Sequence, residues 1–198
     1  MQPQLLGFLY YFTNMQQPIN HLLVLLITVP LFFFVNRNTA VAKETITHAV
    51  VYRCMPCGQD CDNEDYTAAG QCKHCMMPLV EKSTIRFKTI QPGDLCAYIK
   101  AHPKVLLLDV RTKEEFEEKA DPNFGTLKNA INLPIQEFGT GLSALNAYKQ
   151  RDIIVYCSHS HRSPQASYIL MQNGFKNVTN MAGGLSVLTD NSCKVHSK

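Results

Sequence analysis

The sequence predicts an α/β protein: a three-layer domain with a mostly parallel sheet, preceded by a small ribbon that a metal ion stabilises. Strand and helix patterns alternate over residues 84–190, as they do in three-layer parallel architectures. Five of the eight cysteines lie between Cys54 and Cys75, a clustering that favours a metal site over a disulfide framework. The net charge is only +3 and no basic tract occurs, which argues against nucleic acid as a main partner.

The N-terminal segment, residues 1–42, has the composition of a signal peptide or a membrane anchor. It contains no Asp or Glu, and Arg37 is its single basic residue. The apolar run Leu22–Val35 is 14 residues long, which suits a signal-peptide core better than a membrane span, and the small residues Ala40–Ala42 suit cleavage. No Lys or Arg precedes the run, so an uncleaved anchor with membrane association through residues 5–35 stays open. We therefore expect an exported protein, either periplasmic or membrane-anchored.

The ribbon, residues 50–82, is rich in turn-forming residues and lacks any long periodic stretch, so it cannot build a hydrophobic core of its own. Two C-x2-C pairs are predicted to replace that core: Cys54 with Cys57, and Cys72 with Cys75. Each such turn directs two thiolates at one ion, and two turns complete a tetrahedral zinc site that stabilises the fold. Two disulfides are the alternative in an oxidising compartment.

Cys61 and His74 are possible extra ligands, and soft sulfur ligands suit copper or another soft metal as well as zinc. The stretches Tyr52–Cys57 and Gly70–Leu79 resemble the short heavy-metal-binding ribbon attached to copper-transporting ATPases and efflux proteins. Cys57 stands where that family has His, and this difference favours an all-thiolate, zinc-like set.

The first half of the α/β region contains four predicted elements. Thr84–Ile90 alternates with period two and predicts a strand, and Pro92–Ala101 predicts a helix with Pro at its start. Val105–Val110 is aliphatic throughout, which suits a strand buried on both faces. Lys113–Lys119 predicts a charged helix, whose acidic residues we interpret as a solvated face.

The second half repeats the alternation. The predicted strands are Ala130–Leu133, Asp152–Tyr156 and Val178–Met181, and the predicted helices are Leu142–Tyr148, Arg162–Asn173 and a short one after Gly184. Gly174 closes the longest of these helices. Residues 191–198 are expected to form a flexible tail.

Cys157 follows the buried strand Asp152–Tyr156 and precedes a helix, the position at which open α/β sheets bind ligands. Backbone N–H groups of the following loop can form a nest for an anion, and the helix dipole and Arg162 add positive potential. These features favour the thiolate, so we expect Cys157 to be nucleophilic near neutral pH, with Arg162 as its anion-binding partner. The residues expected to line the substrate loop are Ser158, His159, Ser160 and His161.

The residues around Cys157 resemble the rhodanese family of sulfurtransferases. Three further stretches match in order and spacing: Leu107–Phe116, Gly125–Pro134 and Met181–Leu185. The resemblance implies a rhodanese-like fold over 84–190 and a Cys157 persulfide. That persulfide would carry sulfane sulfur from thiosulfate or a persulfide donor to an acceptor such as a thiol or cyanide, without an organic cofactor. Related phosphatases need a loop one residue longer than the four residues that separate Cys157 from Arg162 here.

Several positions depart from the family pattern. Ser160 stands where many members have Gly, so the loop is expected to need a positive φ at this position. Thr126 replaces the usual His, and Leu188 replaces the usual Trp. We interpret Asp109 and Arg111 as a structural ion pair.

Two other functions stay open. In the first, the protein handles metals and its fold presents Cys157, His159 and His161 as ligands. In the second, it is a thiol redox protein in which Cys157 forms a disulfide with Cys193 or Cys61. We expect Cys96 to belong to the core, and Cys193 to be a passive free thiol.

Overall fold

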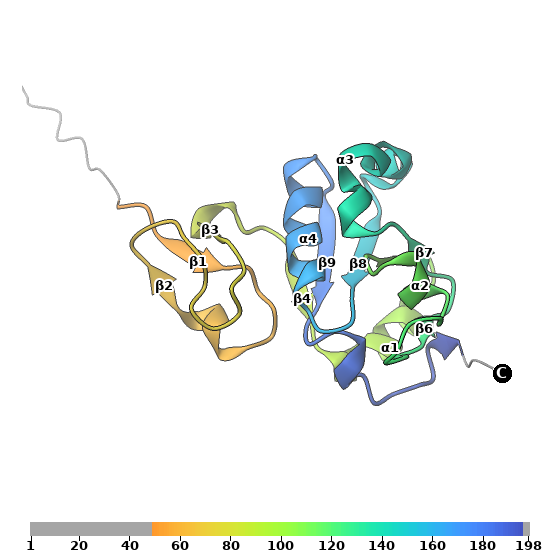
Figure 1. Ribbon diagram of the computed structural model, residues 1–198. Coiled ribbons are helices and arrows are strands. Elements are labelled where there is room, and N and C mark those ends of the chain that lie inside the picture. Colours follow the sequence, from red (N-terminus) through yellow and green to blue (C-terminus); the bar gives the residue numbers. More distant parts are fainter. Residues whose placement is uncertain (1–48, 196–198) are drawn as a thin grey trace, which may run out of the picture. The chain divides into compact units, whose positions relative to one another are not determined.

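The computed structural model of the chain describes residues 49–195 (Figure 1). The predicted signal peptide or anchor, residues 1–42, lies outside the described residues. Within 49–195, no helix combines the length and the apolar character needed to cross a membrane.

The ribbon is a three-stranded antiparallel sheet with the order β2-β1-β3. Its strands are β1 (Tyr52–Cys54), β2 (Asp65–Tyr66) and β3 (Leu79–Glu81), and a 3₁₀ helix over Asp60–Asn63 joins the first two. The most deeply buried side chains here are cysteines: Cys54, Cys57, Cys61 and Cys72. Thiol groups therefore occupy the interior where a larger domain would place its aliphatic core.

The larger part of the structure is a five-stranded sheet with the order β4-β9-β8-β5-β7, and every neighbouring pair of strands is parallel. Its strands are β4 (Lys88–Ile90), β5 (Leu106–Asp109), β7 (Ile131–Asn132), β8 (Asp152–Tyr156) and β9 (Asn177–Met181). The predicted parallel sheet is confirmed, with β8 as its central strand. The loop after β8 therefore leaves the middle of the sheet.

Helices cover both faces of this sheet (Figure 1). They are α1 (Pro92–Ala101), α2 (Lys113–Phe116), α3 (Phe138–Gly141) and α4 (Arg162–Gln172). Alternate residues of β5 face opposite cores: Leu108 belongs to the cluster that contains Leu170 of α4, and Leu107 to the cluster that contains Leu95 of α1. This alternation in a strand that is aliphatic on both faces produces the predicted three layers.

Three elements differ clearly from the prediction, two in where they begin or end and one in helix type. The strand predicted over 84–90 begins only at Lys88, because a 3₁₀ turn occupies Lys82–Thr84. The helix predicted over 113–119 ends at Phe116, where the side chain of Thr126 donates a hydrogen bond to the Phe116 carbonyl. The segment Leu142–Tyr148 is a 3₁₀ helix rather than an α-helix.

The C-terminal segment is tied to the domain. Strand β10 (Lys194–Val195) pairs antiparallel with β6 (Thr126–Leu127), and Cys193 forms a disulfide with Cys96 of α1. The expectation of a free Cys193 is therefore wrong, and the tail predicted over 191–198 differs from the structure at Cys193–Val195. Cys96 is buried as expected, but its partner lies 97 residues away and no local pattern connects the two.

Cys193→Ser is expected to lower the free energy of unfolding by about 2–4 kcal/mol, because the disulfide restricts a long segment of the unfolded chain. Urea denaturation followed by circular dichroism measures this loss. Cys96→Ser should match it, and the double variant should be no less stable than either single variant, because both side chains act through one bond. Additive losses would contradict this explanation.

Candidate functional site

Cys157 lies at the end of the central strand β8 and is buried, with only 1% of its surface exposed. Its thiol donates a hydrogen bond to Ser163 Oγ at 3.4 Å, at the start of α4. In the loop between strand and helix, Ser158 and Ser160 are buried, whereas His159 and His161 are exposed. The loop thus encloses the thiol with small polar residues and keeps both imidazoles on the surface.

The backbone of this loop offers several unpaired donors. Among the described residues, no acceptor lies within hydrogen-bond reach of the N–H groups of Ser158, His159, Ser160 and His161. The first N–H groups of α4 are also free of helical partners, as at every helix N-terminus. A run of free N–H groups beside the positive end of a helix dipole is an anion-binding site. The loop therefore has the free donors that the predicted nest requires.

The shape of the loop depends on a turn at Gly183 and Gly184. The N–H of Leu185 donates to the Cys157 carbonyl, and the N–H of Ser186 to the Ser158 carbonyl, both at 2.9 Å. A Cβ at Gly184 would lie 2.7 Å from the carbonyl oxygen of Cys157 and closer still to that of Ser158. Only glycine permits this approach, which explains the double glycine in the sequence.

Ser160 adopts a φ of +57°, as expected for a position where many relatives have Gly. Its hydroxyl donates to the Met181 carbonyl at 3.3 Å, and this bond holds the residue in a conformation that non-glycine residues rarely adopt.

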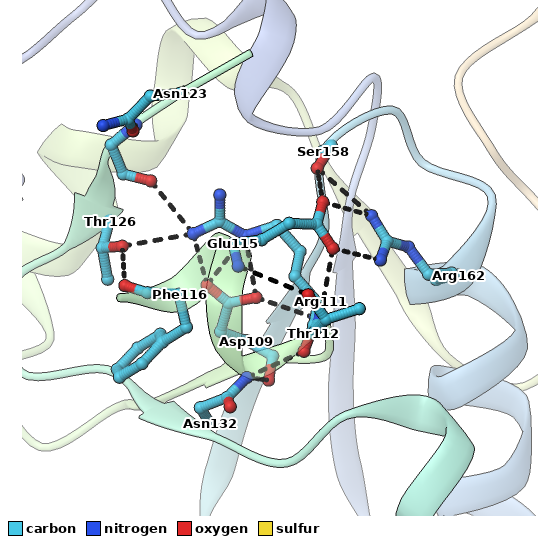
Figure 2. A network of polar contacts seen from close by, with 11 residues as sticks. Asp109, Arg111, Thr112, Glu115, Phe116, Asn123, Thr126, Asn132, Ser158 and Arg162 are labelled. Carbon is cyan, nitrogen blue, oxygen red and sulfur yellow. Dashed lines mark hydrogen bonds and ion pairs between the residues drawn. The ribbon is translucent and has the colours of Figure 1, made fainter. Parts of the chain in front are cut away.

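Glu115 of α2 holds the loop from the other side (Figure 2). Its carboxylate accepts hydrogen bonds from Arg162 at 2.5 and 2.8 Å and from the Ser158 hydroxyl at 2.7 Å. It also accepts from the N–H of Thr112, whose hydroxyl caps the same helix in return. The Arg162 guanidinium lowers the pKa of Glu115 to about 2, and the Ser158 hydroxyl adds to this effect. Partial burial acts in the opposite direction but is outweighed.

This contact changes the interpretation of two residues. Arg162 was expected to bind the donor anion, but two of its nitrogens are engaged by Glu115 and Ser158. Arg162 is therefore first a support for the loop. Glu115 was assigned to a solvated acidic face, whereas it contacts the site itself; the T-x-x-E capping-box pattern that begins at Thr112 was the signal that could have identified its orientation.

Asp109 and Arg111 form a fully buried ion pair at 2.7 Å, which confirms their structural role. Arg111 also donates to the carbonyl of Gly125 and to the Thr126 hydroxyl (Figure 2). Because each buried charge meets its partner and further hydrogen bonds, this network fixes the end of β5 beside the loop without an uncompensated charge.

Four ribbon thiols form a set that can hold a metal. The sulfur atoms of Cys54, Cys61, Cys72 and Cys75 all lie within 4.8 Å of one another, and all four cysteines are free of disulfides. A tetrahedral zinc site with four sulfur ligands has sulfur atoms about 3.8 Å apart, so the spacing fits such an ion.

The protonation of these thiols also fits a cation. Burial and the neighbouring Cys75 raise the pKa of Cys54. At Cys72 burial acts in the same direction, but the N–H groups of Cys75 and His74 outweigh it and lower the pKa to about 6. Crowded, buried thiols resist joint ionisation, and a bound cation removes that cost. The residues present therefore suit a metal.

Cys61, predicted as a possible extra ligand, belongs to the four-thiol set, and Cys57, predicted as a ligand, lies in another group that could hold a metal. Cys57 belongs to a second group, with Cys54, Cys61 and Asp62, and its thiol donates to Asp62 Oδ1 at 3.4 Å. The Asp62 carboxylate accepts from the N–H groups of Cys57 and Gly58, so it serves to hold this turn. The 3₁₀ helix over Asp60–Asn63 brings Cys61 into the four-thiol set, which the C-x2-C spacing does not reveal. His74 lies outside both groups and contacts Glu64 at 2.8 Å.

Two alternative arrangements around Cys157 are not formed. Within 49–195, the groups that could hold a metal do not include Cys157, His159 or His161, and the ring of His159 packs edge-on against Phe124. A disulfide between Cys157 and Cys193 is also absent from the described chain, because Cys193 is paired with Cys96.

Comparisons with known proteins identify the family of the α/β region. A family profile described as rhodanese-like domain matches residues 93–191. A sulfurtransferase of Allochromatium vinosum is 36% identical over 81 residues, covering 41% of this chain and 68% of that protein. A tRNA uridine(34) hydroxylase of Hamiltonella defensa is 32% identical over 113 residues, covering 51% of this chain, which spans only 30% of the hydroxylase. A solved rhodanese-related protein of Thermoplasma volcanium has a TM-score of 0.46 and 29% identity, covering 57% of this chain and 100% of that one.

Glu115→Gln is expected to lower the free energy of unfolding at pH 7 by about 1–2 kcal/mol, because it weakens a partly exposed charged contact. The folded pKa of Glu115 lies below its unfolded value, so this contribution is present above about pH 4.5 and is lost as the pH falls toward 2. Urea denaturation at several pH values between 7 and 3 measures this. The difference in the free energy of unfolding between wild type and variant should become smaller as the pH falls. A constant difference would contradict the assignment.

Cys61→Ser is expected to lose the bound metal, whereas Cys57→Ser should retain it, because only the former belongs to the four-thiol set. Elemental analysis of the purified variants after zinc loading gives the metal content of each. The opposite result would restore the ligand set that the C-x2-C spacing predicts.

Proposed function

The chain belongs to the rhodanese-like domain family, and from this we propose that it is a sulfurtransferase that carries sulfane sulfur on Cys157. The observation that carries the proposal is the run of unpaired N–H groups over 158–161 around a buried thiol. Such a nest stabilises two anions in turn: the incoming sulfur donor and the persulfide that it leaves behind.

The first step loads sulfur on the enzyme. The Cys157 thiol gives up its proton, and the thiolate attacks the outer sulfur of thiosulfate. The sulfur–sulfur bond of the donor breaks, and sulfite leaves with the electron pair of that bond. Cys157 then carries a persulfide, whose terminal charge faces the free N–H groups of the loop.

The second step transfers the sulfur from Cys157 to an acceptor. A thiolate or cyanide attacks the terminal sulfur of the persulfide, and the Cys157 thiolate leaves with the bonding electrons. The Ser163 hydroxyl, which contacts Cys157 Sγ at 3.4 Å, can donate to this leaving thiolate. Glu115 and Arg162 act as positioning residues, since their ion pair holds Ser158 within the loop.

The depth of Cys157 supports the choice of a small substrate. Cys157 is almost fully buried, so a small anionic donor suits it better than a bulky one. The hydroxylase of Hamiltonella defensa matches 51% of this chain and is covered to only 30% of its own length, and the low net charge of this chain gives no support for an RNA partner.

The ribbon is proposed to hold one zinc ion through Cys54, Cys61, Cys72 and Cys75. A four-thiolate set closes the coordination of the metal, which is the pattern of a structural site. Bound zinc would supply folding energy to a ribbon with few aliphatic core residues. A copper ion bound by the same sulfur atoms is the alternative.

The disulfide between Cys96 and Cys193 supports a location in an oxidising compartment. We propose that the protein works outside the reducing cytoplasm, as its N-terminal composition also predicts. Trapping the thiols in intact cells with an alkylating reagent tests this: Cys96 and Cys193 should be protected until a reductant is added. Labelling of both cysteines without reduction would contradict it.

Incubation of the metal-loaded protein with thiosulfate should add one sulfur atom to Cys157, and cyanide should remove it. Intact-mass analysis measures this gain, which should be absent in Cys157→Ser. The matched control Cys57→Ser, which changes a buried thiol outside the loop, should still gain sulfur. No gain with thiosulfate or with a persulfide donor would refute the sulfurtransferase assignment.

A further inference from the structure

The metal-binding ribbon contacts the turn that supports the catalytic loop. The N–H of Gly183 donates to the Cys57 carbonyl at 3.2 Å, and the N–H of Leu185 donates to the Cys157 carbonyl at 2.9 Å. These two donors are separated along the chain only by Gly184. A single short turn is therefore hydrogen-bonded to the ribbon at one end and to the Cys157 loop at the other.

Asn180 provides a second connection. Its side-chain amide donates to the Pro56 carbonyl at 2.9 Å and lies 3.5 Å from the Ser160 hydroxyl. Asn180 is fully buried, and Ser160 is the loop residue with the left-handed backbone. The amide therefore bridges the first Cys turn of the ribbon and the most constrained residue of the loop.

The contact between the ribbon turn at residues 56–58 and the segment 182–184 leaves little free space. A Cβ at Gly58 would lie 2.8 Å from the Cβ of Ala182 and 3.2 Å from the backbone nitrogen of Gly183. Because the backbones are already in contact, a shift of the ribbon turn cannot be absorbed by an empty gap. Movement of residues 56–58 must displace either the glycine turn or Asn180.

We propose that metal binding in the ribbon and the reactivity of Cys157 are energetically coupled through the glycine turn and Asn180. The proposal rests on the sulfurtransferase function for its biological meaning. In this arrangement the metal fixes Cys54 and Cys61, these fix the turn at Pro56 and Cys57, and that turn fixes the Cys157 loop. Asn180 is a positioning residue, since it touches neither the metal ligands nor the reacting sulfur in this scheme.

Such coupling acts in both directions: if bound metal favours one conformation of the loop, a modification of Cys157 that disturbs this conformation must also change the affinity for the metal. Removal of the metal should loosen the loop and alter the reactivity of Cys157. Occupation of Cys157 should in turn alter the retention of zinc. Neither effect depends on catalytic turnover.

The first experiment compares zinc-loaded and chelator-stripped protein in two assays. Peptide-resolved mass spectrometry follows the rate of Cys157 alkylation by iodoacetamide, and hydrogen exchange follows the N–H groups of residues 157–162 and 183–186. We expect stripping to change the alkylation rate by about fivefold or more and to speed exchange in both segments. Circular dichroism verifies that the α/β domain stays folded after stripping.

The second experiment measures the reverse effect and the bridge. Zinc release to a chromogenic chelator is timed for protein with free Cys157 and with carboxamidomethylated Cys157. We expect the two rates to differ in wild type and to converge in Asn180→Ala. The control Asn173→Ala, which removes an exposed amide bonded to the Ile169 carbonyl at the end of α4, should keep the wild-type difference.

Equal alkylation and exchange with and without zinc, together with equal release rates, would overturn the proposal and leave the ribbon as an independent structural unit. A chain that shows coupling but accepts no sulfur would refute the sulfurtransferase function alone. Should Asn180→Ala fail to fold, the comparison of zinc-loaded and stripped wild type still decides the question.

Discussion

The close approach of the Gly183–Gly184 turn to the carbonyls of Cys157 and Ser158 is the constraint on which the site depends. A side chain at Gly184 would collide with these carbonyls, and in its absence two backbone hydrogen bonds form to them. The carbonyls of Cys157 and Ser158 are thereby held by the turn, while the N–H groups of residues 158–161 make no backbone hydrogen bond within the part of the chain that the structure describes. The donors of the predicted anion nest thus belong to a segment whose position the glycine turn fixes.

The charge balance of the site follows from the same arrangement. Arg162, the obvious cation of the loop, is paired with Glu115, so this ion pair adds little net charge next to Cys157. The positive potential at the thiol then comes mainly from backbone dipoles, which do not change with pH. In the proposed reaction, a persulfide held by such dipoles would meet a fixed set of donors, which would need no reorganisation as sulfur arrives and leaves.

The sequence was informative wherever a pattern was local. The buried strand before Cys157, the helix with Pro92 at its start and the positive φ at Ser160 all follow from residues that are close in the chain, and the structure confirms them. Features that depend on long-range contacts were missed. The pairing of Cys96 with Cys193 needs knowledge of the folded C-terminus.

The sequence predicts the metal ligands only in part, because their arrangement also depends on the fold of the chain. The C-x2-C pattern locates the ribbon site, but the choice between Cys57 and Cys61 depends on how a short 3₁₀ helix turns the chain. Glu115 illustrates a different failure: in a run of acidic residues, charge alone cannot distinguish the one carboxylate that faces inward. The capping pattern carries that information because it fixes the rotation of the helix relative to its first residue.

The distribution of thiols explains how a reactive cysteine can persist beside an oxidised pair. In the described chain, five of the six free cysteines lie in the ribbon, where a bound cation would occupy the sulfur atoms of four of them, and the sixth is Cys157. Disulfide exchange requires the sulfur of the partner to approach along the bond that breaks, which is difficult for a protein disulfide at a thiol this deeply buried. In the proposed function, the same depth would favour small sulfur donors over large ones and would protect the thiol from bulky oxidants.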